Sequence, residues 1–249
     1  MNSFCDTVVV ISLESRKKYI MDTMNSMGIR VRIFDAVLGS DLNQESLIDR
    51  GIIAKKNSFK NINEIACALS HLTVISNFYN DPYSKRLCVF EDDILPDPDY
   101  VSKFEKCISE LPSDFEFLNM GRCYASCHLD KKVGENISIS IDSLCSHSYI
   151  ITKSGAKKIL DNSRPISLAV DNYYATLMKD SSLKFYSSSP RIFNQIKAVD
   201  KTFKSSLMNN DDCPECREVV IQSWCVFTLF SFILILVIFF FLASKKFKF

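Results

Sequence analysis

Apolar and polar positions along the chain follow the order expected of a protein in which strands and helices alternate. The β-branched run at 7–11 predicts a buried strand. The polar stretch that follows predicts a helix from Arg16 to Met27, which ends at Gly28. Alternation over 30–34 then predicts a second strand. A strand–helix–strand opening is typical of α/β proteins.

The same two periodicities continue through the next 150 or so positions, roughly one domain's length. They predict helices over 41–51, 63–79, 99–111, 154–160 and 172–178, and strands over 87–90, 114–120, 137–141, 145–152 and 183–186. The stretch 190–204 is basic, and we expect it to be irregular.

Three consecutive acids, Glu91, Asp92 and Asp93, follow the apolar strand at 87–90. They cannot all be buried without partners, because each desolvated charge costs several kcal/mol and like charges repel. A hard divalent cation with oxygen ligands would satisfy them. The alternative is a solvated turn, since Pro96-Asp-Pro98 comes shortly afterwards.

Composition narrows the range of partners. The formal net charge of +1 gives no electrostatic reason to expect nucleic acid. The chain has only 6 glycines and contains neither G-x-G-x-x-G nor a Walker-type loop, which argues against a glycine-rich phosphate cradle.

An uncharged stretch near the C-terminus predicts a membrane anchor. We expect a domain over 1–208, a juxtamembrane linker over 209–222, one transmembrane helix over 223–243 and a basic tail over 244–249. An anchor inserted after synthesis would leave the domain in the cytosol, which is the orientation we expect. The lysines beyond the span favour the reverse.

The ten cysteines are scattered, and their spacing does not indicate a disulfide framework. Cys213-Pro-Glu-Cys216 is either a redox-active pair or half of a zinc site. Asn136-Ile-Ser138 is a glycosylation sequon, which is usable only in a lumenal loop.

Several segments, taken together and in order, resemble glycosyltransferase family 25. They are Val-Val-Val-Ile-Ser-Leu-Glu-Ser-Arg16, Phe-Asp-Ala-Val-Leu-Gly39, Asn-Glu-Ile-Ala-Cys-Ala-Leu-Ser-His71, Val-Phe-Glu-Asp-Asp-Ile94, Tyr-Ile-Ile-Thr-Lys-Ser-Gly-Ala-Lys-Lys-Ile-Leu160 and Ala-Val-Asp171. The most specific feature is Leu-Ser-His71 followed about twenty positions later by the acidic triplet. The resemblance covers roughly residues 7–200.

The resemblance implies an α/β domain with the Rossmann-like GT-A fold. It also implies transfer of galactose or glucose from a UDP-hexose, with inversion and with a divalent metal, usually Mn²⁺. The acceptor would be a glycan, a glycolipid or a protein hydroxyl, as in lipooligosaccharide biosynthesis or collagen galactosylation.

Individual positions then take roles by matching the family's motifs. Glu91 and Asp93 match the outer acids of its D-x-D-like motif, so Asp93 is the first choice of metal ligand. Glu91 or Asp92 would contact the metal or the ribose. Asp171 matches an acid placed before an aromatic helix and would be the general base. The alternative for Asp171 is the N-cap of the helix from Asn172.

Other matched positions belong to the donor side. Ser12, Arg16, Asp35 and Ala36 match the nucleotide-facing start of the family's fold, although Arg16 could also be a solvated charge. His71 is either a partner near the donor or a hydrogen-bonded core histidine.

A few positions raise questions about the match. His147 could ligate a metal, although a lone histidine at the start of a strand usually does not. Ser12 stands where the family usually has Asn, and Ala66 where it usually has Gly, which leaves room for an altered donor pocket.

Three functions are consistent with these features. The leading hypothesis is a membrane-anchored, metal-dependent, inverting glycosyltransferase. The second is a catalytically silent relative that serves as a membrane-bound binding or scaffold protein. The third is a metal-dependent hydrolase, which ranks last because the additional His and Asp ligands of two-metal sites are missing.

Overall fold

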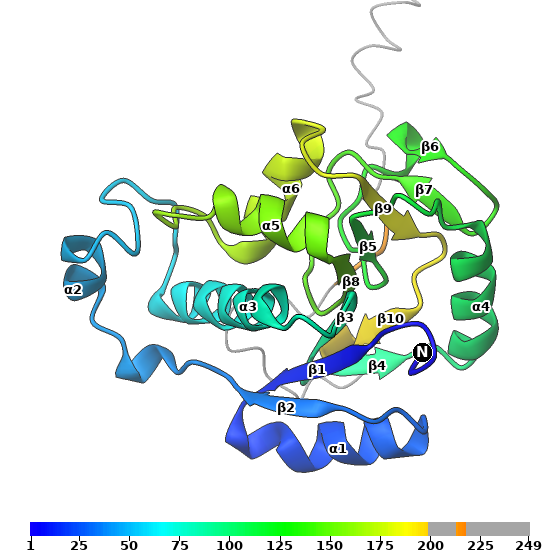
Figure 1. The fold of residues 1–249 in the computed structure, drawn as a ribbon, viewed down its shortest axis with the longest axis horizontal. Coiled ribbons are helices and arrows are strands. Elements are labelled where there is room, and N and C mark those ends of the chain that lie inside the picture. The colour runs from blue at the N-terminus through cyan, green and yellow to red at the C-terminus, as the bar shows by residue number, and fades with distance from the viewer. Residues whose placement is uncertain (199–212, 218–249) are drawn as a thin grey trace, which may run out of the picture. The chain divides into compact units, whose positions relative to one another are not determined.

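A mixed eight-stranded sheet organises the part of the chain that the computed structural model describes, residues 1–198 and 213–217 (Figure 1). Its strands lie in the order β2 (Arg32–Asp35), β1 (Thr7–Ser12), β3 (Arg86–Glu91), β8 (Ser148–Thr152), β5 (Phe117–Asn119), β9 (Phe185–Ser188), β7 (Ile137–Ile139) and β6 (Lys131–Lys132). β1 runs parallel to β2 and β3, and β5 runs parallel to β9, whereas the other pairs are antiparallel. β4 (Ile94–Pro96) and β10 (Phe193–Gln195) form a separate antiparallel pair.

Helices cover both faces of this sheet. α1 (Lys17–Ser26) and α4 (Tyr100–Glu110) pack on one face. On the other face lie α2 (Gln44–Asp49), α3 (Ile62–Asn80), α5 (Lys153–Asp161) and α6 (Val170–Lys179). The result is a three-layer α/β/α arrangement.

β3 shows why a continuous apolar strand suits the middle of such a sheet. Leu87 and Val89 point into the core beneath α3, whereas Cys88 and Phe90 point into the core beneath α1 and α4. Alternate side chains of a strand face opposite sides, so a strand covered on both faces must be apolar throughout. The apolar run therefore ends at the carboxyl end of the strand, at Glu91.

The predicted helices and strands are confirmed, with bounds that shift by a few residues, and Gly28 ends α1 in a left-handed conformation (φ 65°). The prediction that 190–204 is irregular was wrong for Phe193–Gln195, which form β10. Three residues that pair with the distant β4 leave no local pattern, because their partner is set by the tertiary fold.

The predicted membrane anchor is not described by the structure. Among the described residues, no helix combines the length and apolar character needed to cross a bilayer. The expected span (223–243) and the basic tail (244–249) lie outside the described residues, as does most of the expected linker (209–222). Of that linker, residues 213–217 are described, and they belong to the compact unit Met1–Arg217.

The aromatic core provides a test of the fold. Phe117 is buried, and its ring centroid lies 4.8 Å from that of Tyr149 and 4.6 Å from that of Phe185. Phe117→Ala should lower the free energy of unfolding by about 3–5 kcal/mol, because it leaves a cavity between stacked rings. Val101→Ala, on the exposed side of α4, is the control and should change it by less than about 0.5 kcal/mol. Urea denaturation followed by circular dichroism measures both, and equal effects would contradict the assigned core.

Candidate functional site

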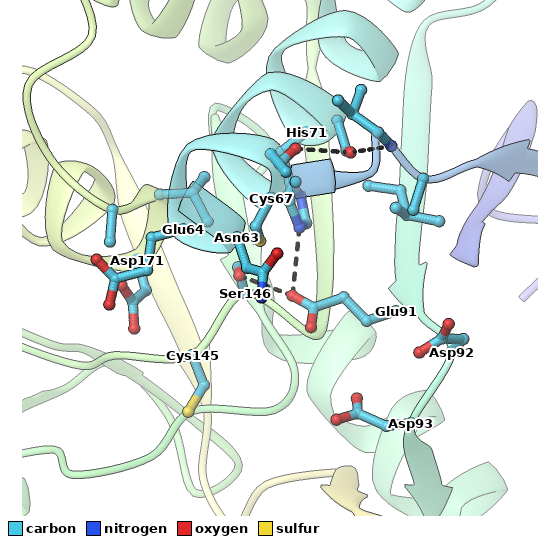
Figure 2. A pocket seen from close by; sticks show the side chains of 18 of the residues that line it. Asn63, Glu64, Cys67, His71, Glu91, Asp92, Asp93, Cys145, Ser146 and Asp171 are labelled. Atoms are coloured by element: carbon cyan, nitrogen blue, oxygen red, sulfur yellow. Dashed lines mark hydrogen bonds and ion pairs between the residues drawn. The ribbon is translucent and has the colours of Figure 1, made fainter. Parts of the chain in front are cut away.

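A cavity of about 740 Å³ opens at the carboxyl ends of β1 and β3. Its walls come from the loops after β1 and β2, the N-terminal half of α3, the loop before β8, the start of α6 and the stretch after β10. Ligands of open α/β sheets bind at such strand ends, where several loops converge. The cavity lining includes most of the predicted site residues, namely Arg16, Ala36, His71, Glu91, Asp92, Asp93 and Asp171. Figure 2 labels His71, the acidic triplet and Asp171 among them.

Ser12 and Asp35 lie outside that lining, although both were predicted on the donor side. Ser12 is buried, its hydroxyl donates to the Leu13 carbonyl at 2.9 Å, and its own carbonyl accepts from Ala36 N–H at 2.9 Å. Asp35 is exposed and pairs with Lys17 Nζ at 2.7 Å. Both residues support the backbone next to the cavity wall, and their side chains are not part of its lining.

Glu91 is the best-anchored member of the acidic triplet. Its Oε1 accepts a hydrogen bond from Ser146 Oγ at 2.8 Å and one from His71 Nε2 at 3.2 Å (Figure 2). Burial by itself would raise the pKa of Glu91, but the hydrogen bond and charge of His71 and the bond from Ser146 lower it to about 2. Glu91 is therefore a fixed negative charge.

His71 connects Glu91 to the core through further hydrogen bonds. The ring is fully buried, and its Nδ1 lies 3.0 Å from the Tyr149 hydroxyl, which in turn lies 3.4 Å from the hydroxyl of Tyr174. Nε2 donates to Glu91, and Nδ1 shares a hydrogen bond with the Tyr149 hydroxyl. His71 is thus a hydrogen-bonded core residue that also orients a carboxylate of the cavity.

Both carboxylate oxygens of Asp92 accept hydrogen bonds from other residues of the protein. Its Oδ2 accepts from Leu13 N–H at 2.7 Å and its Oδ1 from Arg16 at 2.9 Å. Burial raises the pKa of Asp92, although both of these donors favour the charged form. Arg16 is therefore not a solvated charge, and the pair fixes the loop after β1 against the end of β3.

Asp93 has the weakest support of the three acids. It is buried, and within the described part of the chain its carboxylate accepts hydrogen bonds only from Gln195 Nε2, at 3.2 and 3.4 Å. Burial and the negative charges of Glu91 and Asp92 raise the pKa of Asp93 to about 7. A bound cation would therefore stabilise the ionised form of Asp93 more than that of the other two acids.

The opposite wall carries two further acids. Figure 2 shows Asp171 and Glu64 close together across the cavity from the triplet. Asp171 lies in the first turn of α6, whose N-cap is Ala169, so the alternative of an N-cap for a helix from Asn172 was wrong. Burial raises the pKa of Asp171, and the charges of Glu91 and Glu64 act in the same direction.

His147 is not among the residues that line the cavity. It is fully buried, its Nε2 lies 3.1 Å from the Phe193 carbonyl, and it packs so close to Gly121 that a side chain there would overlap the ring. Burial lowers the pKa of His147 to about 4, so the ring is neutral. The contacts favour a structural role over metal ligation.

Some lining residues were missed from the sequence. Ser146 and Lys197 carry no local signal, because one precedes a strand and the other follows a strand that was not predicted. Glu64 could have been found from its helical spacing to His71, seven positions later.

Two disulfides correct the expectation that the cysteines form no framework. Cys123 pairs with Cys145, and Cys127 pairs with Cys216. The partners are 22 and 89 positions apart, so only the fold brings them together. Because Cys216 is used in this way, Cys213-Pro-Glu-Cys216 is not half of a zinc site.

A group of potential soft-metal ligands also lies in the cavity wall. The ligand atoms of Cys67, His71 and Glu91 lie within 4.8 Å of one another. Both ring nitrogens of His71 are already hydrogen-bonded, to Tyr149 and Glu91. The oxygen donors Glu91 and Asp93, whose carboxyl groups point into the same space in Figure 2, fit a hard cation better.

Together these features define an α/β protein with an acidic ligand cavity at the carboxyl edge of its sheet. Its sequence matches the family described as "Glycosyltransferase family 25 (LPS biosynthesis protein)" over residues 5–174. The chain therefore belongs to glycosyltransferase family 25, and the resemblance seen in its sequence is confirmed. A search of curated proteins gives no match.

Three solved structures are distantly similar to this chain. A Drosophila β-1,4-galactosyltransferase 7 in complex with manganese, UDP-Gal and xylobiose has 11% identity and a TM-score of 0.40, covering 82% of this chain and 75% of that one. The inositol-1-phosphate CTP transferase of T. maritima has 14% identity and a TM-score of 0.36, covering 76% and 69%. Mouse xyloside xylosyltransferase 1 has 10% identity and a TM-score of 0.33, covering 72% and 64%. Similarities this weak support no conclusion about the function of this chain.

The environment of Asp93 predicts an unusual pH dependence of stability. Its pKa rises from 3.8 to about 7 on folding, so the folded state binds this proton more tightly than the unfolded chain. The stabilisation is complete below the unfolded pKa and is lost as the pH rises through the folded value. In EDTA, Asp93→Asn should therefore be more stable than wild type at about pH 8, by at most about 4 kcal/mol, and the difference should vanish near pH 4.

Urea denaturation at both pH values measures this difference. Asp49→Asn, at an exposed position of α2, is the matched control and should show no such pH-dependent gain. An Asp93→Asn protein that is less stable than wild type at about pH 8 would contradict the buried, repelled state of Asp93.

Proposed function

We propose that this protein is a metal-dependent, inverting glycosyltransferase with a GT-A-type domain. It would move galactose or glucose from a UDP-hexose to a hydroxyl of a glycan, a glycolipid or a protein. The observation that carries the proposal is Asp93, a buried carboxylate beside Glu91 and Asp92 on the wall of a large cavity. Family membership supports the class of reaction.

The residues present fit a divalent cation such as Mn²⁺. Asp93 forms no salt bridge with another described residue, and Glu91 is ionised and accepts hydrogen bonds from His71 and Ser146 at Oε1. Asp93 would be the first ligand and Glu91 the second, whereas Asp92 is held by Arg16 and Leu13. When bound, the cation would neutralise charge on the departing nucleoside diphosphate.

Basic residues of the chain would add to that neutralisation. Lys197 is buried in the cavity wall, and its charge lowers the pKa of Asp93 against the dominant effect of burial. Arg16 lines the same cavity and is oriented by Asp92. A diphosphate between these two residues would meet positive charge on two sides, and a cation held by the triplet would offset the repulsion from the carboxylates.

Asp171 is suited to take the acceptor's proton. Inversion forms a bond between the acceptor oxygen and the anomeric carbon while the bond from that carbon to the diphosphate oxygen breaks. The hydroxyl proton then needs a base on the acceptor side, and a carboxylate with a raised pKa is a competent one. Asp171 faces the triplet across the cavity, which leaves the space between them for the sugar (Figure 2).

The second candidate function is a catalytically silent relative that binds or scaffolds at a membrane. It is favoured by Ala66, which lies in the cavity wall where the family usually has Gly. The departure at Ser12 matters less, because that side chain turns away from the cavity. Retention of all four acids, Glu91, Asp92, Asp93 and Asp171, favours the enzyme.

A C-terminal, single-pass membrane anchor at 223–243 remains part of this proposal. The cytosolic orientation expected from the sequence is less favoured once the disulfides are considered. Cys123–Cys145 and Cys127–Cys216 would persist in an oxidising compartment and be reduced in most cytosols.

Donor turnover tests the proposal directly. Purified full-length protein in detergent should release UDP from UDP-galactose or UDP-glucose in the presence of Mn²⁺, and EDTA should abolish the release. Asp93→Ala should reduce it to background, because the principal metal ligand is lost, whereas Asp49→Asn should not change it. Failure of the wild type to turn over any common UDP-hexose would favour the silent relative, and full activity of Asp93→Ala would refute the assigned ligand.

A separate substitution tests the base. Asp171→Asn should lower kcat by about a hundredfold to ten-thousandfold while leaving the donor's KM nearly unchanged. Asp180→Asn, at the exposed C-terminal end of the same helix, is the matched control and should keep wild-type kcat. A rise in donor KM with unchanged kcat would instead assign Asp171 to binding.

A further inference from the structure

Three sulfur atoms lie close together beside the cavity, whose lining includes one of the three cysteines, Cys145. Cys123 and Cys145 form a disulfide, and the buried thiol of Cys213 lies 3.8 Å from Sγ of Cys145. The three sulfurs all lie within 4.8 Å of one another. Contact between a free thiol and a disulfide sulfur is the first requirement of thiol–disulfide exchange, which then needs the thiol to turn in line with the S–S bond.

The position of Cys213 is set by contacts around it. The Cys127–Cys216 disulfide ties down the other cysteine of the C-x-x-C pair, and Tyr124 N–H donates to the Pro214 carbonyl at 2.8 Å. Glu215 accepts from Arg122 Nε at 3.0 Å. Residues 213–217 therefore hold the Cys213 thiol against Cys145.

The charge around Cys213 supports its thiolate. Arg191 donates to the Cys213 carbonyl at 2.7 Å, and the same nitrogen lies 4.0 Å from the Cys213 sulfur. A guanidinium beside a thiol favours the thiolate, which is the nucleophile in exchange. Burial acts in the opposite direction and raises the pKa of Cys213, so the reaction should be slow.

We propose that Cys123, Cys145 and Cys213 form a thiol–disulfide exchange site beside the cavity. The Cys213 thiolate attacks Sγ of Cys145, a Cys145–Cys213 bond forms, the Cys123–Cys145 bond breaks, and Cys123 leaves as the thiolate. The proton lost by Cys213 is taken up by Cys123. One disulfide and one thiol are present before and after, so no outside oxidant or reductant is needed.

Exchange at this site would affect two acids of the cavity, Asp171 and Glu91, through Cys145 and its neighbour Ser146. The backbone amide of Cys145 lowers the pKa of Asp171, and the next residue, Ser146, donates to Glu91. Cys145 also holds a left-handed conformation with φ 69°, which is strained for a residue with a side chain. If Cys145 were bonded to Cys213 and not to Cys123, the covalent restraint on this strained loop would change.

Disulfide mapping of the full-length protein tests the proposal. Wild type and variants are equilibrated in glutathione redox buffers, quenched with acid, alkylated, digested at low pH and sequenced by mass spectrometry. Cys123→Ser removes the leaving sulfur, so a Cys145–Cys213 peptide should become the main product. In wild type the same peptide should accompany Cys123–Cys145, and Cys213→Ser should abolish it.

Cys107→Ser is the matched control, because Cys107 is another buried free thiol but lies in α4, and this variant should keep the wild-type map. The proposal is overturned if, at every glutathione ratio, wild type shows Cys123–Cys145 with Cys213 fully alkylated and no Cys145–Cys213 peptide. The wild-type series decides the question even if Cys123→Ser fails to fold.

Discussion

The hydrogen bond from His71 to Glu91 is the interaction on which the cavity depends. It joins the middle of α3 to the end of β3 and continues through Tyr149 and Tyr174 into the core. A buried carboxylate without such a donor would take up a proton or pull water into the site. Because His71 and Ser146 both donate to one oxygen, Glu91 stays ionised and fixed in direction.

The sheet explains why three acids can stand together at all. β3 is covered on both faces, so it is apolar up to its carboxyl end. The acidic triplet begins there, where the chain leaves the core and lines the cavity. The neighbouring β1 ends beside it and supplies Leu13 N–H and Arg16 to Asp92. One acid is thus held by a helix and one by the adjacent loop, whereas Asp93 accepts hydrogen bonds, among the residues described, only from Gln195.

Sequence patterns predicted the elements well where the signal is local. The apolar periodicities of β1, α3 and β3 and the acidic triplet could be identified, and the family's motifs placed Asp171 and His71 on the same cavity. Tertiary contacts could not be predicted. β10 pairs with a distant strand, the Cys127–Cys216 bond joins positions 89 apart, and Ser146 reaches Glu91 from a loop with no distinctive pattern.

The loop before β8 connects these separate features. Within two residues it contains a disulfide sulfur at Cys145 and the Ser146 hydroxyl that helps to keep Glu91 ionised. The backbone amide of Cys145 also lowers the pKa of Asp171, so a shift of this loop would change the electrostatics of both carboxylates. A left-handed residue persists only where surrounding bonds over-determine it, and here the disulfide is one of those bonds. The covalent framework and the electrostatics of the cavity are therefore coupled at a single backbone position.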